Sequence, residues 1–312
     1  MNYRLVFIYI SILSVTIIMI GKLQFLFETN KIDIKERNFH QRNLILSVAI
    51  NLPLINIYRF IRTARSSCNY CHILIFTDNV DNSDYKELVQ LYNTIFLSYK
   101  DHTPQDLKRL SVYSLRFIVY HRYLLANHYD NIFICDLKDV VFQQNIFDHM
   151  KMYNNGELYA FLESEQLSIG ECRVHRAWML TCYDETVFKN LYNQSRSCAG
   201  TILGTYKGII KYLSLMENRI IEKPSCNDQG IHNYIMYYIL NGTSTIRVTH
   251  ETGFLGTLGT TEWVYRNKYG LALNKNKQVY AVIHQFHRSK QFVQQFNNEY
   301  QILPENVLNL KN

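Results

Sequence analysis

The stretch from Tyr129 to Phe147, YDNIFICDLKDVVFQQNIF, combines a buried strand with an acidic turn. Its apolar run NIFIC, at 131–135, is typical of a strand that is covered on both faces of a parallel sheet. Two carboxylates and a lysine follow within four residues, at Asp136, Lys138 and Asp139, before the chain becomes apolar again. The stretch therefore predicts a buried strand whose carboxyl end carries charged side chains.

Strands and helices alternate on the N-terminal side of this stretch. Apolar runs predict strands, and apolar residues at helical spacing predict helices, in the chain order 43–49 (strand), 54–64 (helix), 72–76 (strand), 85–92 (helix), 94–98 (strand) and 107–127 (helix). This alternation predicts an open parallel sheet with right-handed crossovers. The ligand site of such a sheet lies outside the carboxyl ends of its strands.

The two carboxylates at this strand end suit a hard divalent cation. Asp136 and Asp139 can supply oxygen ligands, and phosphate oxygens and water can complete the coordination shell. The spacing is equally consistent with a solvated turn that is capped by an aspartate. Both interpretations stay open at this point.

Composition and charge exclude several classes of protein. The chain has 312 residues, of which 47% are apolar and 19% charged, so disorder is not its general state. Its formal net charge of +7 is spread along the chain without a basic block, and no nucleic-acid partner is expected.

The N-terminal sequence predicts a membrane anchor. Leu5–Gly21 has no charged residue, and a helix of this length spans roughly 26 Å. Bulky residues at its end favour an uncleaved signal anchor over a cleavable signal peptide. The predicted organisation is a cytosolic tail at 1–4, a transmembrane anchor at 5–21, a stem at 22–41 and one folded domain at 42–312.

Two observations disagree about the side of the membrane on which the domain lies. Lys22 and the basic residues of the stem favour the cytosol by the positive-inside rule. The sequences Asn193-Gln194-Ser195 and Asn241-Gly242-Thr243 are N-glycosylation acceptors, which matter only in the lumen. We expect a type II single-pass glycoprotein of the Golgi or endoplasmic reticulum membrane, with its catalytic domain in the lumen.

Seven cysteines allow disulfides in an oxidising lumen and leave at least one thiol. Cys135 is the expected free cysteine, because it ends a buried strand. Cys68 and Cys71 form a CxxC motif without a second metal-binding pair, which disfavours a zinc site. Cys198 and Cys226 are candidate disulfide partners.

Four motifs in order resemble GT-A fold glycosyltransferases. They are the quoted stretch at 129–147, SCAGTILGTYKGIIKYLSLM at 197–216, CNDQGIHNYIMYYI at 226–239 and VIHQFHR at 282–288. The resemblance covers roughly Asn43 to Arg288. It implies a Rossmann-like α/β fold with an open, mostly parallel central sheet and helices on both faces. It also implies a nucleotide-sugar donor, a glycan, protein or lipid acceptor, and Mn²⁺ or Mg²⁺.

The resemblance implies a metal site formed by Asp136, Asp139 and His284. One departure concerns Lys138, which stands where a strict DxD motif has its second acid. The two acids would share the ion in a variant geometry, or one of them would bind it through water. In a third alternative, Lys138 would contribute positive charge to the diphosphate and reduce the dependence on metal. His284 follows the apolar strand YAVI and has a purely structural alternative, with His287 as its nearby competitor.

The nucleotide is expected to contact the first strand ends. Asn51 and Asp78 are candidate base or ribose contacts, and Arg116, Lys138 and Arg288 are candidates to bind phosphate. Each has an ordinary alternative as a cap or a surface ion pair.

Catalysis is assigned to Asp228, which would orient the acceptor or act as a base, or to Glu163. Glu165 is a rival of Glu163. The alternative for Asp228 is a structural role as a helix N-cap.

Three functions from different classes remain. The first is a membrane-anchored glycosyltransferase, expected to be a hexosyltransferase. The second is a catalytically inactive relative that binds glycans or scaffolds other transferases, which Lys138 supports. The third is a phosphohydrolase with Asp136 as nucleophile, but the second Asp and the following Thr that such an enzyme needs are absent.

Overall fold

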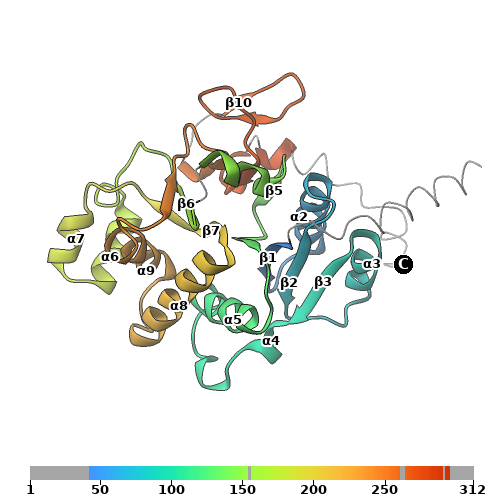
Figure 1. Cartoon of the computed structure of the whole chain (residues 1–312), viewed down its shortest axis with the longest axis horizontal. Helices are drawn as coiled ribbons and strands as arrows, with labels where there is room; N and C mark the ends of the chain where they lie inside the picture. The colour runs from blue at the N-terminus through green and yellow to red at the C-terminus, as the bar shows by residue number, and fades with distance from the viewer. Residues whose placement is uncertain (1–41, 154–155, 261–263, 291, 296–312) are drawn as a thin grey trace, which may run out of the picture. The chain divides into compact units, whose positions relative to one another are not determined.

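The computed structural model describes residues 42–153, 156–260, 264–290 and 292–295 (Figure 1). All of them belong to one compact unit, Arg42–Asn312. The predicted tail at 1–4, anchor at 5–21 and stem at 22–41 lie outside the described residues. Within the described ranges, no helix combines the length and apolarity that crossing a membrane requires.

A seven-stranded sheet forms the centre of the described part of the chain, in the order β3-β2-β1-β4-β7-β6-β8. Its strands are β1 (Asn43–Ala49), β2 (His72–Thr77), β3 (Thr94–Ser98), β4 (Asn131–Cys135), β6 (Leu158–Leu162), β7 (Ser197–Thr205) and β8 (Thr245–Val248). Neighbours pair in parallel except at β7, which runs antiparallel to both β4 and β6. The mostly parallel sheet is thus confirmed, with one reversed strand beside the acidic turn.

Helices cover both faces of this sheet, as predicted. In β1, Ile45 packs into one core, while Leu44 and Leu46 pack into the other. The first core contains α2 (Leu54–Ser67) and α3 (Ser83–Tyr92). The second contains α5 (Val112–Ala126), α8 (Tyr206–Glu222) and α9 (Asp228–Tyr234), and Figure 1 shows α5 and α8 next to each other.

The helix predicted at 107–127 begins later than expected. Ser111 caps α5, because its Oγ accepts a hydrogen bond from the backbone N of Ser114 at 3.3 Å. Residues 105–107 form a separate 3-10 turn, η1 (Gln105–Leu107), after Pro104. The cap at Ser111 therefore sets the start of α5, and the apolar residues before it do not belong to the helix.

A smaller sheet brings the C-terminal part of the chain to the acidic turn. Its order is β5-β12-β9, formed by β5 (Val140–Phe142), β12 (Val282–His284) and β9 (Leu255–Thr257). β5 directly follows Asp139, and its pairing with β12 sets His284 opposite Val140. This register places His284 beside the acidic turn.

The remaining elements connect these layers. They are α4 (Tyr99–His102), η2 (Ile146–Tyr153), α6 (Arg173–Cys182), α7 (Glu185–Leu191), the π-helical turn η3 (Ile235–Ile239), η4 (Leu258–Thr260), β10 (Tyr265–Arg266), β11 (Ala272–Leu273) and η5 (Phe286–Arg288).

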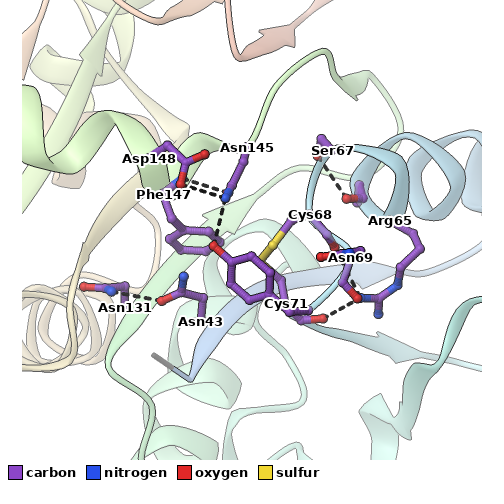
Figure 2. The surroundings of a disulfide bond; sticks show 12 residues. Asn43, Arg65, Ser67, Cys68, Asn69, Cys71, Asn131, Asn145, Phe147 and Asp148 are labelled. Atoms are coloured by element: carbon purple, nitrogen blue, oxygen red, sulfur yellow. Dashed lines mark hydrogen bonds between the residues drawn. A yellow bond between two sulfur atoms is a disulfide. The ribbon is translucent and has the colours of Figure 1, made fainter. Parts of the chain in front are cut away.

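One disulfide, Cys68–Cys71, closes the loop between α2 and β2. Figure 2 shows the Arg65 side chain reaching this loop, where Nη1 donates to the carbonyl oxygens of Cys68, Asn69 and Cys71 at 2.8–3.3 Å. The other five cysteines are free thiols. Cys135 is free as predicted, whereas the pairing of Cys198 with Cys226 is wrong. Cys198 instead lies against the ring of His284, with Sγ 3.6 Å from Nδ1.

Candidate functional site

A cavity of about 500 Å³ lies at the carboxyl ends of β1 and β4. Its walls come from the β1–α2 connection, the start of α5, the acidic turn after β4 and the segment after β12. Six predicted site residues line it: Asn51, Arg116, Asp136, Lys138, Asp139 and Arg288. The fold thus gathers side chains that are up to 237 positions apart in the sequence around one space.

Asp136, Asp139 and His284 form one cluster beside this cavity. Each offers one donor atom, and these atoms all lie within 4.8 Å of one another. The His284 side chain is only 1% exposed. The structure therefore brings together the three residues that the sequence assigned to a metal site.

The unengaged oxygens of the two carboxylates are directed toward the same nitrogen. Asp136 Oδ1 accepts a hydrogen bond from Arg116, and its Oδ2 lies 3.3 Å from His284 Nε2. Asp139 Oδ2 lies 2.7 Å from His287 Nδ1, and its Oδ1 lies 3.7 Å from His284 Nε2. His284 Nε2 is buried and has no hydrogen bond of acceptable geometry. Two oxygens and one nitrogen fit Mn²⁺ or Mg²⁺, provided that substrate or water supplies further ligands.

Charge pairing controls the protonation of this cluster. Burial raises the pKa of Asp136, but Arg116 and His284 outweigh it and hold the pKa below its usual value. Burial lowers the pKa of His284, yet Cys198 and the two carboxylates raise it well above the usual value. The carboxylate of Asp136 therefore stays ionised and available as a ligand.

Gly200 leaves the space that the cluster needs. It lies in β7 next to the end of β4, and its carbonyl accepts a hydrogen bond from the Asp136 backbone N at 2.8 Å. A Cβ at this position would lie 2.6 Å from Asp136 Oδ2 and 2.7 Å from His284 Cε1. Real Cβ atoms do not approach other atoms this closely, so a side chain here would displace the cluster.

Arg116 connects this cluster to Asp228. The guanidinium donates from Nη1 to Asp136 Oδ1 and from Nη2 to Asp228 Oδ2, the latter at 3.2 Å. Burial lowers the pKa of Arg116, but the two carboxylates raise it above its usual value. Burial raises the pKa of Asp228 by more than Arg116 lowers it. The site thus contains a permanently charged guanidinium between two carboxylates.

The N-cap interpretation of Asp228 is wrong. Asn227 is the cap, because its side chain accepts a hydrogen bond from the Gln229 backbone N at 2.9 Å. Asp228 is therefore the first residue of α9, and its carboxylate is available to Arg116. The amide of Gln229 binds the backbone of β7 at Ser197 and Ala199, which fixes the start of α9 against that strand.

Glu163 lies outside the residues that line the cavity. It is 5% exposed, and its Oε2 pairs with Arg196 Nη1 at 2.9 Å. Burial raises the pKa of Glu163, while Arg196, Arg288 and His284 lower it less strongly. Glu163 therefore interacts electrostatically with two residues of the site, Arg288 and His284. Glu165 is exposed two residues further on.

Asn51 and Asp78 form one unit at the ends of β1 and β2. Asn51 has a left-handed backbone with φ of 52°, a conformation that asparagine tolerates better than most residues. Asp78 Oδ2 accepts a hydrogen bond from the Asn51 backbone N at 2.9 Å. Asp78 itself does not line the cavity; its other oxygen, Oδ1, accepts a hydrogen bond from Thr77 Oγ1 at 3.3 Å.

Sequence reasoning missed three residues around the cavity. Tyr113 is 68% exposed at its rim, one helical turn before Arg116, and this spacing was the available signal. Gln285 has a left-handed backbone with φ of 58° between His284 and Phe286. Arg59 donates to the Lys138 carbonyl at 2.8 Å and stacks on the ring of Phe286, and no sequence pattern indicated this long-range contact.

No protein-family profile matches the chain, and no curated protein sequence matches it. Among solved structures, it resembles LgtC, a GT-A fold galactosyltransferase. LgtC in complex with donor and acceptor sugar analogues aligns with a TM-score of 0.47 and 12% identity, over 84% of this chain and 98% of that chain. An active-site mutant of LgtC aligns with a TM-score of 0.49, at the same identity and coverage. The fold and the site of this chain are therefore argued from its own strands and side chains.

The Gly200→Ala variant tests whether β7 supports the metal cluster. We expect its apparent affinity for Mn²⁺ to fall by roughly tenfold or more, because a contact that supports ligands is worth this much. The added methyl group should also cost about 1–3 kcal/mol of stability through overpacking. Titration of free Mn²⁺ by electron paramagnetic resonance and urea unfolding measure the two effects.

Ala199→Gly is the matched control, since it also changes one methyl group in β7 but on the opposite face of the strand. It should leave the Mn²⁺ affinity unchanged. Equal Mn²⁺ affinities of Gly200→Ala and wild type would show that the cluster does not bind the ion.

Proposed function

We propose that this chain is a glycosyltransferase that moves a sugar from a nucleotide-diphosphate donor to an acceptor. The observation that carries the proposal is the convergence of Asp136, Asp139 and His284 beside a cavity at the carboxyl ends of parallel strands. A donor of this kind needs one site for its diphosphate and another for the transferred sugar. The cavity offers groups of suitable charge for both.

The diphosphate is assigned to the side of the cavity that carries positive charge. Lys138 and Arg288 are exposed there, and both line the cavity. A divalent cation held by Asp136, Asp139 and His284 would stabilise the charge that develops on the leaving diphosphate. Lys138 would contribute a further positive charge in place of the second acid of a strict DxD motif.

The sugar and acceptor are assigned to the side where Arg116 meets Asp228. Asp228 is 7% exposed and hydrogen-bonded to a guanidinium that lines the cavity. Asp228 does not itself line the cavity, and its proposed role is to orient a hydroxyl group, or to accept a proton, next to Arg116. Glu163 is the second candidate for catalysis, but it pairs with Arg196 and does not line the cavity. The acceptor is a glycan, a protein or a lipid, and a hexose is the proposed sugar.

The nucleoside is assigned to the end of β1. Asn51, held by Asp78, lines the cavity there with Val48 and Leu52. An amide beside apolar side chains can hydrogen-bond the edge of a base while its ring packs on the wall.

We propose further that the domain lies in the lumen of the Golgi or endoplasmic reticulum and that residues 5–21 anchor it in the membrane. Two observations support this location. The Cys68–Cys71 disulfide is typical of oxidising compartments. Asn193 and Asn241, which begin the two glycosylation acceptor sequences, are both exposed.

Thermal stabilisation of the full chain by nucleotide sugars tests the reaction class. We expect one of the UDP, GDP and CMP sugars to raise Tm in the presence of Mn²⁺. At a hundred times its Kd, such a ligand stabilises the folded state by about 2.7 kcal/mol. The double variant Asp136→Asn/Asp139→Asn should lose the Mn²⁺-dependent part. The control Asp81→Asn, an exposed aspartate outside the cavity, should keep it.

Three outcomes of this experiment are informative. Stabilisation together with release or transfer of the sugar supports the glycosyltransferase. Stabilisation without any turnover favours the catalytically inactive glycan-binding relative. Absence of stabilisation by every nucleotide sugar, with and without Mn²⁺, would rule out the proposed function.

Glycosidase treatment tests the location. Protein expressed in eukaryotic cells should lose mass on treatment with an N-glycosidase, and Asn193→Gln and Asn241→Gln should each remove one glycan. Mass spectrometry of the intact protein measures the change. An unchanged mass of the wild-type chain would contradict a lumenal domain.

A further inference from the structure

The free cysteines differ in what surrounds them. Cys135 packs in the core that contains α2, on the opposite face of the sheet from Cys182 and Cys226. Cys198 lies against His284, and Cys172 Sγ lies 3.3 Å from His175 Nδ1. Cys182 and Cys226 remain, and both belong to the same core cluster. All seven cysteines fall within the described ranges, so this comparison includes every candidate.

The contacts around Cys182 and Cys226 join two elements that are distant in sequence. Cys182 ends α6, Cys226 precedes the cap of α9, and the two side chains pack in the same hydrophobic core. Both are buried, at 5% and 7% exposure.

Residues next to the two cysteines also join the end of α6 to the start of α9. Lys223 lies over the ring of Tyr183, the residue after Cys182, at 5.4 Å from the ring centroid. Gly230 lies in the first turn of α9, and a Cβ atom added to it would lie 3.3 Å from Cys182 Sγ. The end of α6 is therefore packed directly against the segment that begins α9.

We propose that Cys182 and Cys226 form a second disulfide in an oxidising compartment. The chain already contains one disulfide, Cys68–Cys71, so oxidising conditions are compatible with its fold (Figure 2). The co-reactant is an external disulfide, either a small molecule or a protein. One thiolate attacks it and releases one thiol, and the other cysteine then attacks the mixed disulfide and releases the second thiol. The chain loses two electrons and two protons, and the external disulfide gains them.

The timing of this step follows from burial. Burial and the neighbouring Cys226 raise the pKa of the Cys182 thiol to about 12, so in the folded protein it is a poor nucleophile at neutral pH. The bond therefore forms while the chain folds, when both thiols are accessible to the external disulfide.

The disulfide would fix the elements that carry the candidate site. It closes a loop that contains α7, β7 and α8, and it ends two residues before Asp228. β7 carries Gly200, and α9 begins with Asp228, so both sides of the cluster belong to or adjoin this loop. This inference does not depend on the proposed glycosyl transfer.

Peptide mapping of the full chain, purified from an oxidising compartment and denatured in N-ethylmaleimide without reductant, tests the proposal. After removal of N-glycans and digestion with trypsin, peptides 177–189 and 220–247 should be linked through Cys182 and Cys226. The bond within peptide 66–86, between Cys68 and Cys71, serves as the internal control. Maleimide on both Cys182 and Cys226, with the control bond intact, would overturn the proposal. So would a bond from either residue to another cysteine.

Single variants provide a second measurement. Cys182→Ser and Cys226→Ser should each expose the partner thiol to maleimide and lower Tm by roughly 5–10 °C without reductant. Cys172→Ser is the control and should leave the linked peptides unchanged. Equal losses of Tm with and without reductant would show that packing, and not a disulfide, accounts for the effect.

Discussion

The guanidinium of Arg116 between Asp136 and Asp228 is the interaction on which the candidate site depends. Without it, the negative charges of Asp136 and Asp228 would repel each other, which raises carboxyl pKa values. The arrangement ties the end of β4 to the start of α9, which are 92 residues apart. Removing one partner of a buried charge pair typically costs about 3–5 kcal/mol, so this contact constrains the geometry of both elements.

Local features allow the distant elements to meet at this contact. Ser111 and Asn227 cap α5 and α9, so that Arg116 lies one turn inside its helix and Asp228 starts its own. On the other side, β12 brings His284 to the turn after β4, and Gly200 leaves room for it. Asp136 and Asp228 therefore bind the same guanidinium, and this guanidinium lines the cavity.

Sequence patterns predicted the parts of this architecture that depend on local hydrophobicity. The strands from 43 to 135, the helices between them and the acidic turn after NIFIC follow from local patterns, and the helices on both faces follow from the resemblance. Strand ends pointed to Asp136, Asp139 and Asn51, and the long helix pointed to Arg116. The reversal of β7, the late start of α5 and the pairing of Glu163 with Arg196 depend on capping or long-range contacts. The cysteines show the same limit: both members of the expected pair are free, and Cys226 packs in the same core as Cys182, because spacing does not specify which elements pack together.

Anomalous diffraction from crystals grown with Mn²⁺ and a nucleoside diphosphate tests the central claim most directly. The account predicts a manganese ion about 2.1 Å from an oxygen of Asp136, an oxygen of Asp139 and Nε2 of His284, the distance typical of small hard cations. Arg116 should still bridge Asp136 and Asp228, and the diphosphate should lie toward Lys138 and Arg288. Manganese at other carboxylates, or an Arg116 that leaves Asp136 when the ion binds, would contradict it.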